Sequence, residues 1–357
     1  YNIYIFNINV HLLSFISFLI IFASLIKAAQ FIFHTWLPDA MEAPTPASAL
    51  IHSSTLVIMG IYFIMRFNIL FEFSIYGNFL LTFIGSFTIA FGAITATFQN
   101  DIKKLVAYST ISQMGYLFCG CGFLCYNEVL FYLSIHALNK AFLFILVGYV
   151  VHFFNGNTDL RYMGSLYIYT LDLFFIFIIV SLNLTGLPYT SGFLAKEFLL
   201  FQTFRDSTLI FIVRTCWFIS FFFTPIYMLL LNFFVFFYSK NSPISTYRLN
   251  YSLAFNKFFK IFNLEIYDYS LVFSKLTSLV LFSLFIVVNI FGEYFVLILI
   301  NFLSLNDLTI IDSLGKFSFN LLNNSLALSN FLEYFLFYLI SFFLLFGIKY
   351  MINLKIN

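Results

Sequence analysis

Long apolar runs determine the solvent in which this chain folds. Several of them reach the roughly 20 residues that an α-helix needs to cross the hydrocarbon core of a bilayer. The chain of 357 residues is 62% hydrophobic and only 9% charged, whereas soluble domains carry about 25% charged residues. We therefore predict an all-α polytopic membrane protein.

The apolar runs predict eight or nine spans. Their expected positions are 10–33, 47–66, 76–97, 105–124, 129–153, 167–201, 209–237, 271–302 and 332–351. Connections up to the seventh run are short, as between antiparallel neighbours in one bundle. Residues 305–330 are too polar to span, and they are expected to form either an interfacial amphipathic helix or a plain loop.

Two of the predicted spans are interrupted. The first runs into the polar, Pro-containing segment KAAQFIFHTWLPDAMEAPTPASALIH, from Lys27 to His52, and the sixth contains TGLPYTSG at Thr185–Gly192, followed by Lys196 and Glu197. A Gly/Pro break inside a membrane frees backbone polar groups, which is tolerated only against packed protein or a water-filled cavity. A broken helix beside a lysine in each half indicates a transporter-like bundle with discontinuous helices.

Five ionisable side chains in or beside the spans are candidate functional residues, since a charge in a bilayer is costly unless water or a partner reaches it. They are Lys27, His52, His136, Lys140 and Lys196. The i, i+4 spacing of His136 and Lys140 places them on one helix face, with Cβ atoms roughly 5–6 Å apart. Histidine exchanges protons near neutral pH, and burial eases proton release from lysine. We predict a proton relay.

Structural alternatives exist for each of these residues. Lys27 stands near a helix end, from which a lysine side chain can snorkel to the membrane surface. His52 can serve in helix packing with a bond to a neighbouring carbonyl. His136 and Lys140 can form ordinary polar packing, and so can the hydroxyls and amide of the YSTISQ segment at 108–113.

Carboxylates to balance these cations are scarce in the predicted spans. Glu197 is the exception, and its position next to Lys196 points it in another direction on a helix. The loops hold Asp39, Glu42, Asp101 and Asp159. An unpaired buried cation is costly, so we expect Lys27 to find an acid on another chain or on a preceding part of this one.

The four cysteines do not suggest a metal site. Three of them fall in one apolar run, YLFCGCGFLCY, without a histidine or acid at ligand spacing. We therefore expect buried thiols and no metal site.

Four sequence blocks resemble the antiporter-like subunits of respiratory complex I, most closely the chain 5 family of NADH:ubiquinone oxidoreductase. In order they are HTWLPDAMEAPTPASALIHSSTLVIMGIY, DIKKLVAYSTISQMGYLF, IHALNKAFLFILVGYVVH and GLPYTSGFLAKEFLL. The resemblance is strong from Lys27 to about Leu200. It implies an antiporter-like helix bundle whose C-terminal part, from the family's seventh helix onward, is represented by this chain.

The resemblance assigns a role to each candidate residue. Lys27 matches the central proton-carrying lysine of the family's broken seventh helix, and His52 matches the histidine of the eighth. His136 and Lys140 match the relay pair of the eleventh helix. Lys196 matches the lysine of the broken twelfth helix, which leads to the exit half-channel. One departure is Tyr132, where many members carry a second histidine.

The implied organisation has two parts. Residues 1–240 are expected to form the antiporter-like transmembrane proton-channel half. Residues 241–357 are expected to form a divergent C-terminal region with about two further membrane helices and a possible interfacial or lateral helix. The family's first six helices are expected on a separate chain, from a split gene, or to have been removed by truncation.

The resemblance implies a proton-translocating membrane-arm subunit of complex I, and so a subunit of an NADH:ubiquinone reductase without redox chemistry of its own. NADH, FMN, iron–sulfur clusters and ubiquinone are expected on other subunits. Expected partners are other membrane-arm subunits, including a neighbouring antiporter-like subunit and a chain that supplies a glutamate for Lys27. No nucleic acid partner is expected.

The resemblance leaves alternatives for function and location. An Mrp-type cation/proton antiporter subunit shares the sequence blocks, and a non-pumping scaffold half-module is a further possibility. The abundance of Phe (56) and Tyr (23) fits an A/T-rich genome such as a mitochondrial one. The mitochondrial inner membrane is therefore the expected location, with a bacterial plasma membrane as the alternative.

Overall fold

The computed structural model describes residues 2–5, 8–154, 156–168, 170–187, 190–202 and 208–238. Within them, four helices are long and apolar enough to cross a membrane: Thr45–Arg66, Ile75–Thr97, Tyr126–Phe153 and Phe211–Phe237. Leu12–Lys27 and Leu173–Thr185 are shorter apolar helices. These helices confirm the predicted multi-pass membrane fold. The features expected at 241–357 lie outside the described residues.

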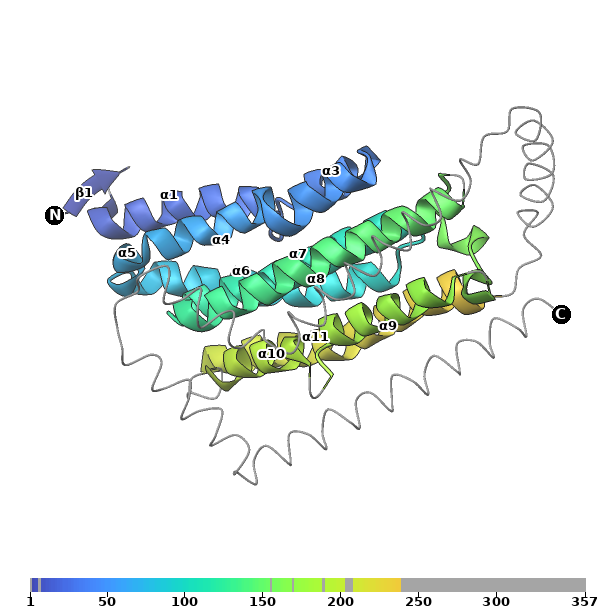
Figure 1. Ribbon diagram of the computed structural model, residues 1–357. Helices are drawn as coiled ribbons and strands as arrows, with labels where there is room; N and C mark the ends of the chain where they lie inside the picture. Colours follow the sequence, from blue (N-terminus) through green and yellow to red (C-terminus); the bar gives the residue numbers. More distant parts are fainter. Residues whose placement is uncertain are drawn as a thin grey trace, which may run out of the picture.

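The helical elements follow one another with short connections (Figure 1). They are α1 (Leu12–Lys27), α2 (Trp36–Asp39), α3 (Thr45–Ala49), α4 (Leu56–Arg66), α5 (Asn68–Glu72), α6 (Ile75–Thr97), α7 (Ile102–Gly122), α8 (Tyr126–Phe153), α9 (Leu171–Thr185), α10 (Ser191–Gln202) and α11 (Thr208–Asn232). Single turns are η1 (Ala40–Glu42), η2 (Leu50–Ser54), η3 (Leu160–Tyr162), η4 (Leu166–Ile168) and η5 (Phe233–Phe237), of which η2 and η5 are π-helical.

A short hairpin precedes the first helix, which the sequence prediction did not include. Strands β1 (Asn2–Ile5) and β2 (Ile8–His11) pair antiparallel, with Asn2 opposite His11. Both strands alternate isoleucine or valine with other residues, a pattern that suits the pleated backbone. Helix α1 consequently begins at Leu12, two residues later than the predicted span.

Helix α7 lies inside the bundle rather than against lipid. It contacts α6, α8 and α4, and Figure 1 shows α6, α7 and α8 between the α1–α4 group and the α9–α11 group. Every residue from Ser109 to Gly122 is buried. A helix enclosed by protein can carry the hydroxyls and amide of this segment, which would be unfavourable against lipid tails.

Glycine allows α6 and α7 to pack closely. A Cβ atom added at Gly92 would stand 2.7 Å from the backbone nitrogen of Ser112. Small residues at such crossings let membrane helices approach and gain van der Waals contact. The close crossing fixes the position of the polar stretch of α7 relative to the rest of the bundle.

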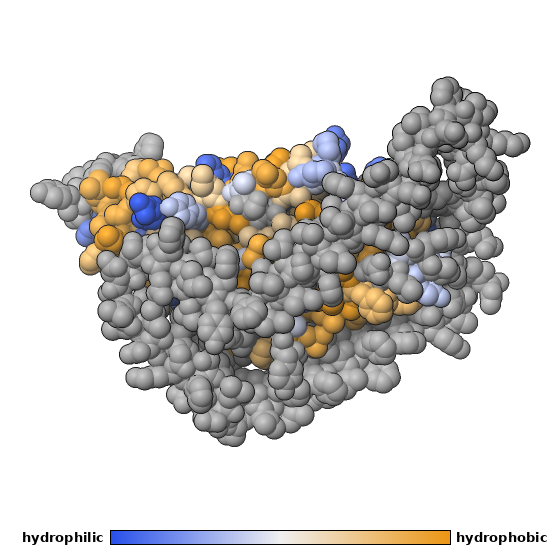
Figure 2. Space-filling view, in the orientation of Figure 1, coloured by the Kyte–Doolittle hydropathy of each residue, from blue (hydrophilic) through white to orange (hydrophobic). Residues whose placement is uncertain are grey.

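The outer face of α1 and α4 is apolar and exposed. Leu19, Phe22, Ile26, Met59 and Tyr62 each keep about half of their surface accessible, and Figure 2 shows hydrophobic side chains over the outer surface of the described helices. Apolar faces of this extent meet either lipid or another membrane helix.

Candidate functional site

The predicted break in the sixth span separates α9 from α10. Helix α9 ends at Thr185, and Gly186 follows with a φ of 80° in the left-handed region, which glycine adopts without a steric penalty. Helix α10 begins at Ser191. The prediction of discontinuous helices is confirmed at this position.

Lys196 on α10 reaches back across the break. Its Nζ atom donates hydrogen bonds to the carbonyl oxygens of Leu184 (2.8 Å) and Thr185 (3.1 Å), and the residue is 2% exposed. The last carbonyls of a helix lack intrahelical partners, and a cation is favoured at this negative end of the helix dipole. The end of α9 therefore holds the lysine ammonium inside the bundle.

Asn183 joins both sides of the same break to α8. Its Oδ1 atom accepts hydrogen bonds from the backbone N–H of Gly192 (2.8 Å) and from Ser191 Oγ (3.1 Å). Its Nδ2 group donates to Asn139 Oδ1 on α8 at 2.9 Å. Asn139 in turn donates to the carbonyl of Ile135 at 2.9 Å. Buried amides thus connect α8, α9 and α10.

His136 and Lys140 lie on the buried face of α8, as their spacing predicted. Lys140 is completely buried and donates a hydrogen bond from Nζ to Ser109 Oγ on α7. His136 is 2% exposed, and neither of its ring nitrogens has a hydrogen-bond partner among the described residues. Since most buried polar atoms are hydrogen-bonded, an imidazole in this condition is open to a further polar partner.

A small cavity separates His136 from Lys196. It has a volume of about 10 Å³ and is also lined by Tyr132, Asn139 and Asn183. A space of this size is close to the lower limit for one water molecule. The histidine of α8 and the lysine of α10 thus line the same small space.

Tyr132 occupies the position one turn before His136. Its hydroxyl donates to Gln113 Oε1 on α7, and its ring centroid lies 6.1 Å from that of His136. Tyr116 continues the aromatic wall, with its ring 6.0 Å from Lys196 Nζ. The hydroxyl of Tyr132 is therefore engaged with α7, while its ring covers the histidine.

His52 lies near α8 one helical turn beyond Lys140, on the side away from His136. It is completely buried in the π-helical turn η2, which packs against α8. Its ring centroid stands 6.2 Å from that of Phe144, which follows Lys140 by one helical turn, and 6.3 Å from that of Trp36. Single π-turns in helices often mark functional positions. The ring of His52 thus lies next to Phe144 of α8.

Lys27 is not brought together with the other four residues. It is the last residue of α1 and is exposed, and it makes no hydrogen bond or ion pair with the described residues. Lys27 is therefore exposed within the described part of the chain, and its expected contact with an acid from outside this part stays a prediction. The reason for the exposure is rotational, because α1 packs through the face of Ser17, Ile21 and Ser24.

Sequence reasoning missed three buried amides. Gln30, in the break after α1, accepts a hydrogen bond from Thr88 on α6 at 2.8 Å. Asn139 and Asn183 form the bond described above. Signals existed for the last two, since Asn139 is i+3 from His136 and shares its face, and Asn183 stands two residues before the predicted break.

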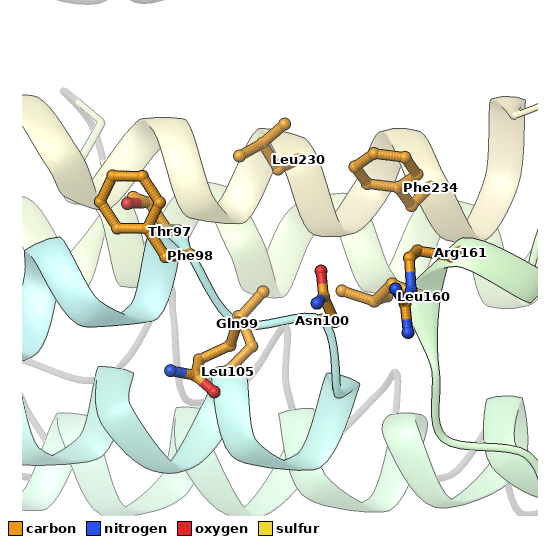
Figure 3. Close-up of a pocket in the computed structure, with 9 residues that line it drawn as sticks. All are labelled: Thr97, Phe98, Gln99, Asn100, Leu105, Leu160, Arg161, Leu230 and Phe234. Atoms are coloured by element: carbon orange, nitrogen blue, oxygen red, sulfur yellow. The ribbon is translucent and has the colours of Figure 1, made fainter.

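A larger cavity lies away from this cluster. Its volume is about 240 Å³, and Figure 3 shows Asn100, Leu160 and Arg161 beside Leu230 of α11 and Phe234 of η5. The guanidinium of Arg161 forms an ion pair with Asp159 at 2.6 Å, which raises the Arg161 pKa above its usual value. None of the five predicted relay residues lines this space.

No group of three or more His, Cys, Asp or Glu side chains in the described residues is arranged to hold a metal ion. The four cysteines are free thiols, of which Cys119, Cys121 and Cys216 are buried. The site consists of protonatable and hydrogen-bonding side chains from helices α7, α8, α9 and α10. Such an arrangement can hold and transfer protons.

Comparison with known proteins places this bundle in a family. Residues 2–224 match the family model described as NADH:quinone oxidoreductase/Mrp antiporter, TM. The chain belongs to this family. The match includes every predicted relay residue.

Relatives in the NADH:quinone oxidoreductase/Mrp antiporter family include curated proteins called NADH-ubiquinone oxidoreductase chain 5. The chain is 52% identical to that of Nyctotherus ovalis over 214 residues, which is 60% of this chain and 12% of the relative. It is 38% identical to that of Chondrus crispus over 264 residues, covering 72% of this chain and 40% of the relative. The chain thus spans less than half the length of these relatives.

A solved structure is similar to the fold. It is described as the Mrp complex from Dietzia sp. DQ12-45-1b, and its matching chain has 31% sequence identity and a TM-score of 0.58. The match covers 63% of this chain and 25% of the other. The fold of this chain is therefore similar to that of one chain of a solved Mrp complex.

Proposed function

We propose that this chain is the proton-relaying part of an antiporter-like membrane-arm subunit of respiratory complex I, in the mitochondrial inner membrane. In this function it carries protons across the membrane while other subunits oxidise NADH and reduce ubiquinone. FMN and iron–sulfur clusters belong to those other subunits. Residues 1–240 form the proton-channel half in this proposal.

One observation carries the proposal. His136, Lys140 and Lys196 are buried together in one bundle, and His136 and Lys196 face the same cavity. Among the described residues none of the three has an ion-pair partner. Burying cations without acids is unfavourable, so retaining several of them beside a broken helix is explained by a role that needs their protons to come and go.

The proposed path runs along α8 to the break. His52 is the entry group of the described bundle, and Lys140 and His136 follow on one face of α8. A proton that leaves Lys140 Nζ is taken by a ring nitrogen of His136, crosses the small cavity and binds Lys196 Nζ. Moving one charge against ~150 mV requires about 3.5 kcal/mol, which the redox reaction of the other subunits supplies.

Lys27 extends the proposal to a partner. Its side chain is exposed beside the apolar outer face of α1. A cation on a face directed toward lipid is unfavourable. We therefore expect another polypeptide segment to cover this face and to place a carboxylate against Lys27.

A second candidate is an Mrp-type cation/proton antiporter subunit, and the similarity to the Dietzia Mrp structure favours it. The two functions require the same relay groups and differ in the assembly around them. A complex I subunit is associated with NADH dehydrogenase, whereas an Mrp subunit is associated with other antiporter subunits.

The test is immunocapture of this chain from native membranes in a mild detergent, followed by an NADH:ubiquinone reductase assay and sequencing of every small hydrophobic chain. Co-purifying reductase activity supports the proposed function. Capture of Mrp subunits without reductase activity overturns it in favour of the second candidate.

The same preparation tests the partner of Lys27. A carbodiimide joins lysines directly to contacting carboxylates. Lys104, which lies 3.7 Å from Asp101, is the internal positive control. We expect Lys27 to be linked to an acid outside residues 1–240. Cross-linking of Lys104 without any product of Lys27 would contradict the expected partner.

A further inference from the structure

We propose that the amide pair Asn139–Asn183 is the positioning element for proton exchange between α8 and the broken helix. The inference rests on the proposed function and extends it to two residues that do not themselves carry a proton. Both side chains are buried, at 1% exposure. They lie 44 positions apart in the sequence and meet through one hydrogen bond of 2.9 Å.

In this proposal the pair sets the distance between His136 on α8 and Lys196 on α10. Asn139 is fixed to α8 by its bond to the carbonyl of Ile135, and it lies on the same helix face as His136. Asn183 is fixed to both half-helices, because it belongs to α9 and accepts from Gly192 and Ser191 on α10. The Asn139–Asn183 bond is consequently a direct polar link from α8 to the element that carries Lys196.

The pair also lines the cavity between His136 and Lys196. The side-chain amide of Asn183 has little rotational freedom, because its Nδ2 group donates to Asn139 while its Oδ1 atom accepts from α10. If the link is lost, α8 and the break lose this direct polar contact. A shift of about 1 Å between reacting groups is enough to slow a transfer by orders of magnitude.

The experiment uses the intact complex in sealed proteoliposomes, in which protons translocated per NADH oxidised are measured beside complex assembly and NADH oxidation. Asn139→Leu and Asn183→Leu each remove the link with little change in volume. Asn232→Leu is the matched control, because Asn232 on α11 donates to Ser181 on α9 at 2.9 Å and does not line the cavity.

We expect both single variants to assemble, to oxidise NADH and to lower the proton ratio to the value of Lys196→Met, while Asn232→Leu keeps the wild-type ratio. The double variant Asn139→Leu/Asn183→Leu is expected to lose no more of the proton ratio than Asn183→Leu alone, because Asn183→Leu already removes the bond to Asn139 together with the bonds to Ser191 and Gly192. A wild-type ratio in the single variants, or an equal loss in Asn232→Leu, would overturn the proposal.

If the leucine variants fail to assemble, a smaller substitution tests the same hydrogen bond. Asn139→Ala removes the acceptor without adding bulk and leaves the bonds of Asn183 to α10 in place. If Asn139→Ala assembles with a normal proton ratio, the pair has a structural role only and the proposal is wrong. If Lys196→Met itself keeps the wild-type ratio, the failure belongs to the proposed function rather than to the amide pair.

Discussion

Replacing Gly186 by alanine strains the break between α9 and α10 and displaces the side chain of Lys196. The backbone at this position has a φ of 80°, and a residue with a Cβ atom pays about 1–2 kcal/mol in the left-handed region. The added Cβ atom would lie 3.1 Å from Lys196 Cδ and 3.6 Å from Nζ. The side chain of Lys196 therefore has to shift by a few tenths of an ångström, and we expect this shift to weaken its hydrogen bonds to the carbonyl oxygens of Leu184 and Thr185.

Gly156 provides a matched control. Its φ is 88°, so alanine there meets a similar backbone strain, but no atom of the described residues lies within 4 Å of the added Cβ position. Gly156→Ala thus isolates the cost of the backbone. The difference between the two variants reports the displacement of Lys196.

Hydrogen exchange measured by mass spectrometry and proton translocation per NADH together test this prediction. A loss of about 1–2 kcal/mol in local opening free energy accelerates exchange roughly 5- to 30-fold. We expect that acceleration near the break in Gly186→Ala and near the end of α8 in Gly156→Ala. Only Gly186→Ala should lower the proton ratio. Equal proton ratios in the two variants would refute the role of Lys196 at the end of α9.

Three further outcomes are expected. Partial burial lowers the pKa of His34, in the connection after α1, from 6.5. The unfolded segment therefore binds more protons in acid than the folded one, so the stability of the folded segment falls as the pH drops below 6.5. His34→Asn should flatten the pH dependence of proteolysis in this connection. Tyr132→Phe leaves Gln113 Oε1 without the Tyr132 donor, so the local opening free energy of α7 should fall by about 1–3 kcal/mol and hydrogen exchange there should accelerate. Tyr126→Phe should not accelerate exchange, because the Tyr126 hydroxyl lacks a partner among the described residues. Gly92→Ala should lower the yield of assembled complex, because its Cβ atom would clash with α7 backbone; a normal yield would contradict the close crossing.

Local patterns allowed much of the fold to be predicted from the sequence. The run Gly186-Leu187 with its following proline predicted the second break, because such residues end helices wherever they stand. The spacing of His136 and Lys140 predicted their shared face for the same local reason. These features depend on neighbours within a few residues.

Features that depend on distant contacts could not be predicted. Helix α1 is largely apolar around its circumference, so the sequence did not show that Lys27 would lie on its exposed side. The bond between Asn139 and Asn183 joins two helices through residues that are 44 positions apart in the sequence. The donation from Lys196 to the carbonyls of α9 requires the exact fold of the break.

Lys140 offers the most direct measurement of the proposed relay. It is completely buried, and its Nζ atom is held by Ser109, so Lys140→Met removes the proton carrier with little change in shape. Lys104→Met, on the exposed first turn of α7 beside Asp101, is the control. Protons translocated per NADH should fall in the intact complex with Lys140→Met and stay at the wild-type value with Lys104→Met. An unchanged ratio in Lys140→Met, at normal assembly and NADH oxidation, would contradict a proton path through this chain.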